Sequence, residues 1–432
     1  MVASHRPAAA IAAILLVLAV AAPARASAGD LDPSFGVDGT TLVGFPEGFD
    51  TYIVDMAVQP DGKIVVVGDL HESEPVALPP FLAPSLKSSG EGLVIVRLSA
   101  DGEADPSFGE GGVVTFEEIG RALDVVIDDQ DRIVASGTIL AADWSRTISM
   151  VRLLSDGSLD PSFGSGGRVT TPSTQYFVNA LVIQPDGKIV SAEESRNRAV
   201  LRRYEADGSV DTTFGLGGRV SVPHVPEGFT DVELQPDGRL VAVGGSLDPT
   251  LLIARFNVDG SLDPTFAGDG MRWTGFGHFQ YAFPVIAGID GSGRVVVIVA
   301  EVFVPAFGLA VYTSRGQLDR TFRGGGTAIV MSPRTLAATG GTLQADGKIV
   351  VTSVDVLPGG DFVFGFGLHR LLPTGRSDPS FGRNGRVLTD FEGTDDMPAC
   401  ISVLVDGRLV VAGIAWLADG SEGLRVARYL AA

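Results

Sequence analysis

A six-residue stretch, LDPSFG at Leu31–Gly36, returns six more times along the chain, and this repetition constrains the fold more than any other feature. The further copies are ADPSFG (Ala104–Gly109), LDPSFG (Leu159–Gly164), VDTTFG (Val210–Gly215), LDPTFA (Leu262–Ala267), LDRTFR (Leu318–Arg323) and SDPSFG (Ser377–Gly382). A repeat of this length that is filled with short apolar segments is typical of β-propellers and solenoids. Although length alone would suggest two or three domains, the repeat predicts one continuous array.

A second marker in each repeat predicts a β-hairpin. It consists of a β-branched run, a tight turn and another β-branched run, as in QPDGKIVVVG at Gln59–Gly68. The equivalent segments begin at Asp128, Gln184, Gln235, Asp290, Gln344 and Leu404. Aspartate and glycine tolerate the backbone geometry of such a turn, so the repeated Asp-Gly is structural.

A third marker is a strand that closes on an arginine. The six examples are LVIVRL (Leu93–Leu98), ISMVRL (Ile148–Leu153), AVLRRY (Ala199–Tyr204), LLIARF (Leu251–Phe256), FGLHRL (Phe366–Leu371) and LRVARY (Leu424–Tyr429), whereas the fifth unit has LAVYTS (Leu309–Ser314) without arginine. We expect each arginine to pair with the aspartate of the nearby LDPSFG motif and fix its turn. The phenylalanine of the motif is expected to fill the space between neighbouring units.

The markers predict an all-β fold, a seven-bladed β-propeller of four-stranded antiparallel blades. A β-solenoid is the alternative architecture. The two ends of the array favour a closed ring, because it begins with a lone fourth strand at Thr40–Phe45 and stops after a third strand at Arg425–Leu430. Pairing these two strands would complete the seventh blade and leave no open edge between the first and last units.

Taken together, the three markers resemble the delta-60 repeat family of exported bacterial β-propellers. The resemblance covers Leu31 to Leu430, which is almost the whole chain after its N-terminal segment. It implies a propeller fold and export from the cytoplasm. It implies no catalytic residue, because the family has no established biochemical activity.

The N-terminal segment is typical of a secretory signal peptide. Its apolar run, Ala8–Ala22, is shorter than the roughly 20 residues of a spanning helix and is followed by a small-residue pattern ending at Ala26. We expect cleavage after Ala26 or Ala28, which makes 1–26 the signal peptide and 31–432 a single propeller domain. The protein would then be secreted, periplasmic or attached to the cell surface, with no membrane span; an uncleaved membrane anchor is the alternative.

The charge and cysteine content exclude several classes of protein. The net charge is −20, and it becomes −22 when cleavage removes Arg6 and Arg25. An acidic surface repels nucleic acid and anionic lipid, so neither is an expected partner. The single cysteine, Cys400, excludes an internal disulfide framework, and the fold must depend on a hydrophobic core. A monomer is expected.

The alternation of strand direction separates two faces of the predicted disc. We call the side with the Asp-Gly hairpins and LDPSFG turns the turn face, and the side with the variable connections, including the long Asp69–Gly92 insertion, the loop face. Binding residues occur preferentially on loops held by a rigid scaffold, so the loop face is the expected contact surface. The candidate ligand-binding residues there are Trp144, His224, His278, Tyr281 and Trp416.

Three aspartates occupy equivalent positions when the innermost strands are aligned on the Lys or Arg of each hairpin. Asp55, Asp124 and Asp231 fall in this column, and the other four units have Ala180, Ile286, Gly340 and Cys400. We expect the three carboxylates at the mouth of the central channel, where like charges raise each other's pKa or bind a cation. Calcium is the candidate ion because it accepts several oxygen ligands in loose geometry. The alternative is that each aspartate accepts a hydrogen bond from a nearby backbone N–H of its own strand and that no cofactor is bound.

No familiar motif for metal-dependent or serine hydrolysis or for phosphate binding occurs in the sequence. The sequence therefore predicts a binding or scaffold module that contacts protein or carbohydrate at the cell surface through the loop face. The alternative is an enzyme of lyase or hydrolase type with its site at the channel mouth. Titratable residues that converge there with perturbed pKa values would favour the enzyme.

Overall fold

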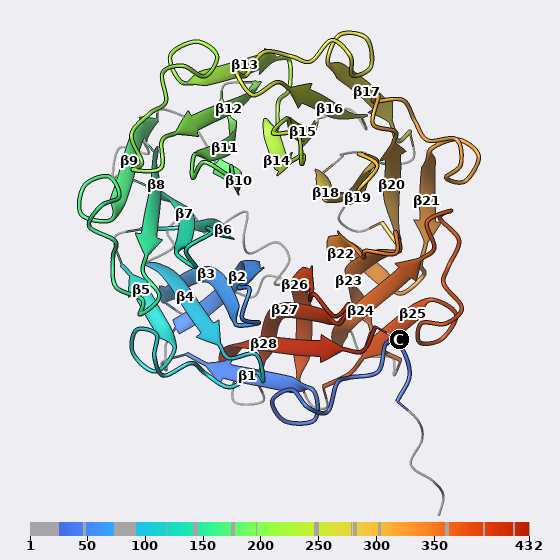
Figure 1. Ribbon diagram of the computed structural model, residues 1–432. Helices are drawn as coiled ribbons and strands as arrows, with labels where there is room; N and C mark the ends of the chain where they lie inside the picture. The colour runs from blue at the N-terminus through green and yellow to red at the C-terminus, as the bar shows by residue number, and fades with distance from the viewer. Residues whose placement is uncertain are drawn as a thin grey trace, which may run out of the picture.

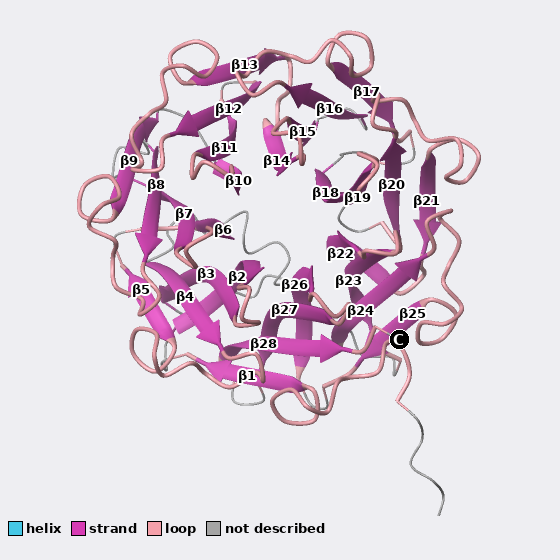
Figure 2. Ribbon diagram, viewed as in Figure 1, coloured by secondary structure: helices cyan, strands magenta, loops and turns pink. Residues whose placement is uncertain are grey.

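The structure is a computed structural model. It describes residues 26–45, 49–72, 92–117, 119–140, 146–173, 178–195, 197–245, 250–277, 279, 283–300, 304–358, 363–391, 394–417 and 420–431. In this part of the chain, twenty-eight strands form seven four-stranded antiparallel sheets arranged around one axis (Figure 1). Figure 2 shows that strands and loops account for all of the described architecture. The predicted seven-bladed β-propeller is confirmed.

The strands of the first four blades are given from the axis outward. Blade 1 contains β2 (Phe49–Val58), β3 (Ile64–Glu72), β4 (Gly92–Leu98) and β5 (Val113–Phe116). Blade 2 contains β6 (Ala122–Ile127), β7 (Ile133–Leu140), β8 (Arg146–Leu153) and β9 (Arg168–Ser173). Blade 3 contains β10 (Val178–Ile183), β11 (Ile189–Glu194), β12 (Arg198–Tyr204) and β13 (Arg219–Pro223). Blade 4 contains β14 (Phe229–Leu234), β15 (Leu240–Gly245), β16 (Thr250–Phe256) and β17 (Met271–Gly275).

The remaining three blades complete the ring in the same order. Blade 5 contains β18 (Phe283–Ile289), β19 (Val295–Ala300), β20 (Ala306–Tyr312) and β21 (Thr327–Met331). Blade 6 contains β22 (Thr335–Leu343), β23 (Ile349–Val356), β24 (Phe364–Leu371) and β25 (Arg386–Thr389). Blade 7 contains β26 (Asp395–Val403), β27 (Leu409–Trp416), β28 (Glu422–Tyr429) and, as its outermost strand, β1 (Thr40–Gly44).

Blade 7 is therefore built from both ends of the described chain, as the sequence predicts. β1 pairs antiparallel with β28, and the paired residues run from Thr40 opposite Ala427 to Gly44 opposite Gly423. The bounds differ from the prediction by only a few residues, because Phe45 lies beyond β1 and β28 begins at Glu422. The innermost strands also contact one another in sequence around the axis, and β26 contacts β2 to close the circle.

The hydrophobic core consists of seven clusters, each lying between two neighbouring blades. Successive residues of a strand point to opposite faces of its sheet, so a central strand contributes to two clusters. In β3, for example, Ile64 and Val66 pack towards blade 7 while Val65 and Val67 pack towards blade 2. This explains why the middle strands are apolar runs instead of alternating polar and apolar residues.

The seven phenylalanines of the LDPSFG motifs are fully buried, with one in each interblade cluster. The predicted role of these rings in filling the space between blades is confirmed. The burial of one such side chain contributes about 2–3 kcal/mol. The complete burial of these rings also removes them as stacking surfaces for a sugar or a base.

The LDPSFG turn keeps its backbone shape even where its last glycine is replaced. Gly215 has φ = 54°, and Ala267 and Arg323 adopt φ = 57° and 51° at the same position. The left-handed region is unfavourable for residues with a Cβ atom, so blades 4 and 5 carry local backbone strain.

In the part of the chain that the structure describes, no helix is long and apolar enough to cross a membrane.

Candidate functional site

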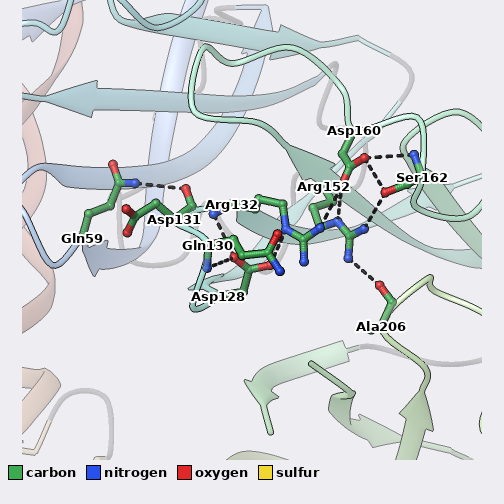
Figure 3. A network of polar contacts seen from close by, with 9 residues as sticks. All are labelled: Gln59, Asp128, Gln130, Asp131, Arg132, Arg152, Asp160, Ser162 and Ala206. Atoms are coloured by element: carbon green, nitrogen blue, oxygen red, sulfur yellow. Dashed lines mark hydrogen bonds and ion pairs between the residues drawn. The ribbon is translucent and has the colours of Figure 1, made fainter. Parts of the chain in front are cut away.

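The turn face is held together by an arginine network that recurs in six blades. In blade 2, Arg152 Nε lies 2.8 Å from Asp160 Oδ2, and its other guanidinium nitrogens donate to Ser162 Oγ and to the carbonyl oxygen of Ala206 in blade 3 (Figure 3). The guanidinium also lies over the ring of Phe163, 4.5 Å from the centroid. One side chain therefore ties a strand, a turn and the next blade together.

The predicted arginine–aspartate pairs are confirmed in every unit that has the arginine. The pairs are Arg97–Asp105, Arg152–Asp160, Arg203–Asp211, Arg255–Asp263, Arg370–Asp378 and Arg428–Asp32, with N···O distances of 2.7–2.9 Å. Burial alone would raise the pKa of Asp211, but hydrogen bonds from Lys188, Thr213 and Arg203 outweigh burial and lower it.

Blade 5 keeps the contact although it has lost the arginine of its third strand. The hairpin residue Arg294 takes its place, with Nε 2.7 Å from Asp319 Oδ2 and a second nitrogen 2.8 Å from the carbonyl oxygen of Pro373 in blade 6. The motif of this unit, LDRTFR, keeps its aspartate as Asp319, but the new partner was not predicted from the sequence. The lysine or arginine that follows the hairpin turn in each repeat could have suggested Arg294 as the partner. In blade 3 the equivalent residue, Lys188, also contacts the motif aspartate.

The structure places the three aligned aspartates on the innermost strands of blades 1, 2 and 4, and each of them contacts the next blade. Asp55 accepts a hydrogen bond from the backbone N–H of Val125 in blade 2 at 3.2 Å, and Asp124 accepts one from Leu181 in blade 3. Asp231 accepts one from Ile286 in blade 5 at 2.7 Å. An innermost strand is the edge of its sheet and has unpaired N–H groups, so these carboxylates satisfy donors of the adjacent blade.

Asp124 and Asp231 also accept a hydrogen bond from their own strands, from the N–H groups of Val125 and Val232. The strands bulge at this level, because the pairing register shifts between Ala122 and Asp124 and again between Phe229 and Asp231. Such a bulge reorients the side chain that follows it. The contacts therefore agree with the predicted own-strand role and add an interblade contact that the sequence analysis missed.

Three carboxyl groups on the innermost strands, those of Asp124, Asp231 and Glu233, have raised pKa values. Burial raises the pKa of Asp124 well above its usual value, and the neighbouring Asp55 carboxylate raises it further. Burial raises the pKa of Asp231 to about 6, although its two backbone donors oppose the change. Glu233, two residues further along β14, has a pKa of about 8 because of burial and the charge of Asp231. Strand alternation was the signal that could have identified Glu233, because residues two apart share a face.

In the described residues, no three His, Cys, Asp or Glu side chains lie close enough together to hold a metal ion. Asp55, Asp124 and Asp231 thus do not form a metal-binding cluster in this structure. Asp124 and Asp231 each accept two backbone hydrogen bonds, and Asp55 accepts one. Calcium binding at this level stays a prediction.

The loop-face candidates are only partly described. Trp144, His278 and Tyr281, together with most of the Asp69–Gly92 insertion, lie outside the described residues. His224 is exposed in the connection before β14, with φ = 62°. Trp416 is half-buried at the end of β27 in blade 7, and its indole N–H donates to Glu422 Oε1 at 2.7 Å. His224 and Trp416 therefore lie on different blades.

One buried group in blade 6 has the residue types of a hydrolase triad but a different arrangement. Ser353 Oγ donates to Asp355 Oδ1 at 2.9 Å, and His369 Nε2 lies 3.2 Å from the same hydroxyl. Asp355 is also paired with Arg386 at 2.5 Å. Burial lowers the pKa of His369 to about 4. A catalytic serine gives its proton to the histidine, whereas Ser353 is bonded to the carboxylate and fully buried, so this group is structural.

Comparisons with known proteins agree with the fold. Five segments of the chain match the profile of a domain of unknown function, the DUF5122 β-propeller, over residues 59–75, 131–163, 184–214, 235–266 and 406–431. The chain is similar to a β-propeller family of unknown function. The matched segments begin at or within the hairpin turns and contain the second strands of five blades, and three of them extend into an LDPSFG-type motif. No curated protein matches the chain.

Several solved structures match the chain at low identity and with TM-scores under 0.5. An aldose sugar dehydrogenase from Streptomyces coelicolor with bound PQQ is 13% identical over 71% of this chain and 94% of that chain, with a TM-score of 0.39. A gluconolactonase from Xanthomonas campestris is 13% identical over 72% of this chain and 98% of that chain, with a TM-score of 0.34. Prolyl oligopeptidase B from Galerina marginata is 11% identical over 84% of this chain and 48% of that chain, with a TM-score of 0.47. Similarity at this level bears on neither the site nor the activity.

Proposed function

We propose that the protein is an exported, monomeric binding or scaffold module of the delta-60 repeat type, which contacts protein or carbohydrate through its loop face. The observation that carries this proposal is the contrast in connection length between the two faces. On the turn face, every hairpin connection between the first two strands has five residues, and in blades 1 to 6 every connection to the outermost strand has fourteen. On the loop face, the connections between the second and third strands range from three residues (195–197) to nineteen (73–91).

This contrast has a physical reason. The turn-face connections carry the arginine network and the buried phenylalanines, so their lengths are constrained by packing between blades. Among the described residues, no contact of this kind recurs in the loop-face connections, and a rigid ring can carry loops of different lengths at little cost in stability. The uniform side is therefore the scaffold, and the variable side is where individual contacts can be built.

The contacts of the described N-terminal residues also support a position for signal cleavage. The carbonyl oxygen of Ala28 accepts a hydrogen bond from the N–H of Gly382 at 2.9 Å, and Ala28 is buried in the cluster between blades 6 and 7. Cleavage after Ala28 would remove these contacts. Of the two predicted positions, cleavage after Ala26 therefore fits the fold better.

The test is binding of the protein to a panel of soluble glycans and purified cell-surface proteins, measured by biolayer interferometry. A variant that combines His278→Ala and Tyr281→Ala, and keeps the buried Phe279, should lose or weaken binding to any ligand found. The control variant Val405→Ser changes a fully exposed residue of a turn-face hairpin and should bind like the unaltered protein. An equal loss in both variants, or no ligand in either class, would contradict the proposal.

A second candidate function is an enzyme with its site at the axis. The observation that favours it is the set of raised carboxyl pKa values at Asp124, Asp231 and Glu233, since such shifts are common at catalytic sites. The same shifts also follow from buried interblade contacts. Thermal melting of the protein, first with a chelator and then with millimolar calcium, distinguishes an ion site at the axis from purely structural contacts. A calcium-dependent rise that Asp124→Asn abolishes supports an ion site, whereas no rise in the unaltered protein removes it.

A further inference from the structure

A pocket of about 690 Å³ lies at the outer rim of the ring, where blade 3 meets blade 4. Its walls come from the start of β13, from the LDPSFG-type turn of blade 3 and from the Asp259–Ser261 turn that precedes the motif of blade 4. The volume is within the range of about 300–1,000 Å³ that is usual for small-molecule sites. The pocket is near the turn face, so it is separate from the contact surface proposed above.

Arg219 is the first residue of β13 and lines the pocket. Arg168 and Arg386 stand at the same strand position in blades 2 and 6, and both have partners. The guanidinium of Arg168 lies 5.4 Å from the ring centroid of Phe116, and Arg386 pairs with Asp355 at 2.5 Å. Within the described part of the chain, the Arg219 side chain makes no hydrogen bond or ion pair.

A second arginine reaches the same pocket. Arg198, at the start of β12, donates to Ser221 Oγ at 3.2 Å, and Ser221 follows Arg219 by two residues on β13. Residues two apart in a strand share a face and are spaced by about 7 Å. The guanidinium of Arg198 is therefore held on the face of β13 that Arg219 occupies.

The pocket has one carboxylate, Asp259, in its lining, so the two arginines still leave it with a net positive charge. Asp259 Oδ1 accepts hydrogen bonds from the N–H and the hydroxyl of Ser261, at 2.9 and 2.7 Å. Two guanidinium groups on one face of a pocket repel each other unless an anion lies between or beside them. Such a cationic pair is unexpected in a protein with a net charge of −20.

We propose that this rim pocket binds a small ligand through a carboxylate or another oxyanion group, which Arg198 and Arg219 hold together. The planar guanidinium donates two parallel hydrogen bonds to such a group. Leu216, whose side chain is 88% exposed, and Val220 supply an apolar wall beside the charges. The hydroxyl groups of Thr213 and Ser221 also line the pocket and can bond a polyhydroxylated ligand. An acid sugar combines these features, and a free inorganic anion offers the oxyanion alone.

The experiment is isothermal titration of the protein with glucuronate, glucose and inorganic phosphate at low ionic strength. We expect glucuronate or phosphate to bind and glucose not to bind, with affinity that falls as salt is added. Arg219→Gln should weaken binding by about tenfold or more, because it removes a charged donor pair. The control is Arg383→Gln, which removes the same charge from an exposed position on the turn of blade 6. Thermal melting of each variant checks that the fold is intact.

Tighter binding of glucuronate than of phosphate would identify an acid sugar as the ligand class, and the reverse would identify an inorganic anion; both support the oxyanion site. The proposal is overturned if neither anion binds at millimolar concentration. It is also overturned if Arg219→Gln and Arg383→Gln bind alike, since the attraction would then come from overall surface charge.

Discussion

Blade 5 offers a direct measurement of what the repeated arginine contact contributes to stability. Asp319 is a buried motif aspartate whose nearest cation is Arg294, at 2.7 Å, with both side chains less than 15% exposed. Val311 stands where the other blades have arginine, since it accepts the hydrogen bond from the Asp319 N–H that Arg203 accepts from Asp211 in blade 3. Arg294→Ala should therefore leave Asp319 without its cation.

The expected cost follows from the burial of the pair. Removing one partner of a buried ion pair costs about 3–5 kcal/mol. The hydroxyl and the N–H of Thr321 would still donate hydrogen bonds to Asp319, so we expect a cost at the lower end of this range, about 3 kcal/mol. The matched control is Arg239→Ala in blade 4. Arg239 is 37% exposed, and its partner Asp263 keeps Arg255 at 2.8 Å, so the control should cost less than about 1 kcal/mol.

The assay is urea unfolding followed by tryptophan fluorescence and circular dichroism, with coincident transitions as the check of two-state behaviour. A rescue variant combines Arg294→Ala with Val311→Arg. The new arginine would contact Asp319 from the strand position that the other blades use, so the variant should recover part of the lost free energy of unfolding. Equal destabilisation by Arg294→Ala and Arg239→Ala would refute the argument. A rescue variant less stable than Arg294→Ala alone would show that blade 5 no longer has room for the strand arginine.

Four further results are expected. Deletion of Arg425–Ala432 removes the pairing that closes blade 7, so the protein should aggregate or lose cooperative melting; melting like the full chain would mean that closure contributes little. Replacement of Glu74–Ser89 by a short Gly-Ser link should leave stability nearly unchanged, and a large loss would show that the insertion packs into the core. Ala267→Gly should raise the free energy of unfolding by about 1 kcal/mol by relieving a left-handed backbone, whereas a decrease would mean that the alanine is unstrained. The pKa of Asp231, about 6, lies above the unfolded value of about 4, so protonation favours the folded state. The contribution of Asp231 to the free energy of unfolding therefore increases as the pH falls from 7 towards 4.5 and is lost as the pH rises through 6. In urea unfolding at the two pH values, Asp231→Asn should reduce this increase by about 1–2 kcal/mol.

The architecture could be predicted from the sequence, because a repeat specifies its unit many times over. Seven copies of LDPSFG, each with a hairpin and most with an arginine strand, constrain strand number, strand order and even closure by Thr40–Gly44, since every copy must satisfy the same backbone hydrogen bonds. The arginine–aspartate pairs were predictable for the same reason: both partners recur at constant spacing along the chain.

Contacts between blades could not be predicted from the sequence, because they join residues fifty or more positions apart that no local pattern relates. Asp55 meets the N–H of Val125 only because the ring brings two innermost strands together, and burial there raises the pKa of Asp124 and Asp231. The substitution of Arg294 for the missing strand arginine likewise depends on the hairpin and the LDPSFG turn meeting on one face. The pocket at Arg198 and Arg219 forms between turns of two blades. Side chains at equivalent positions of the repeat have different neighbours there, so the repeat does not predict the pocket.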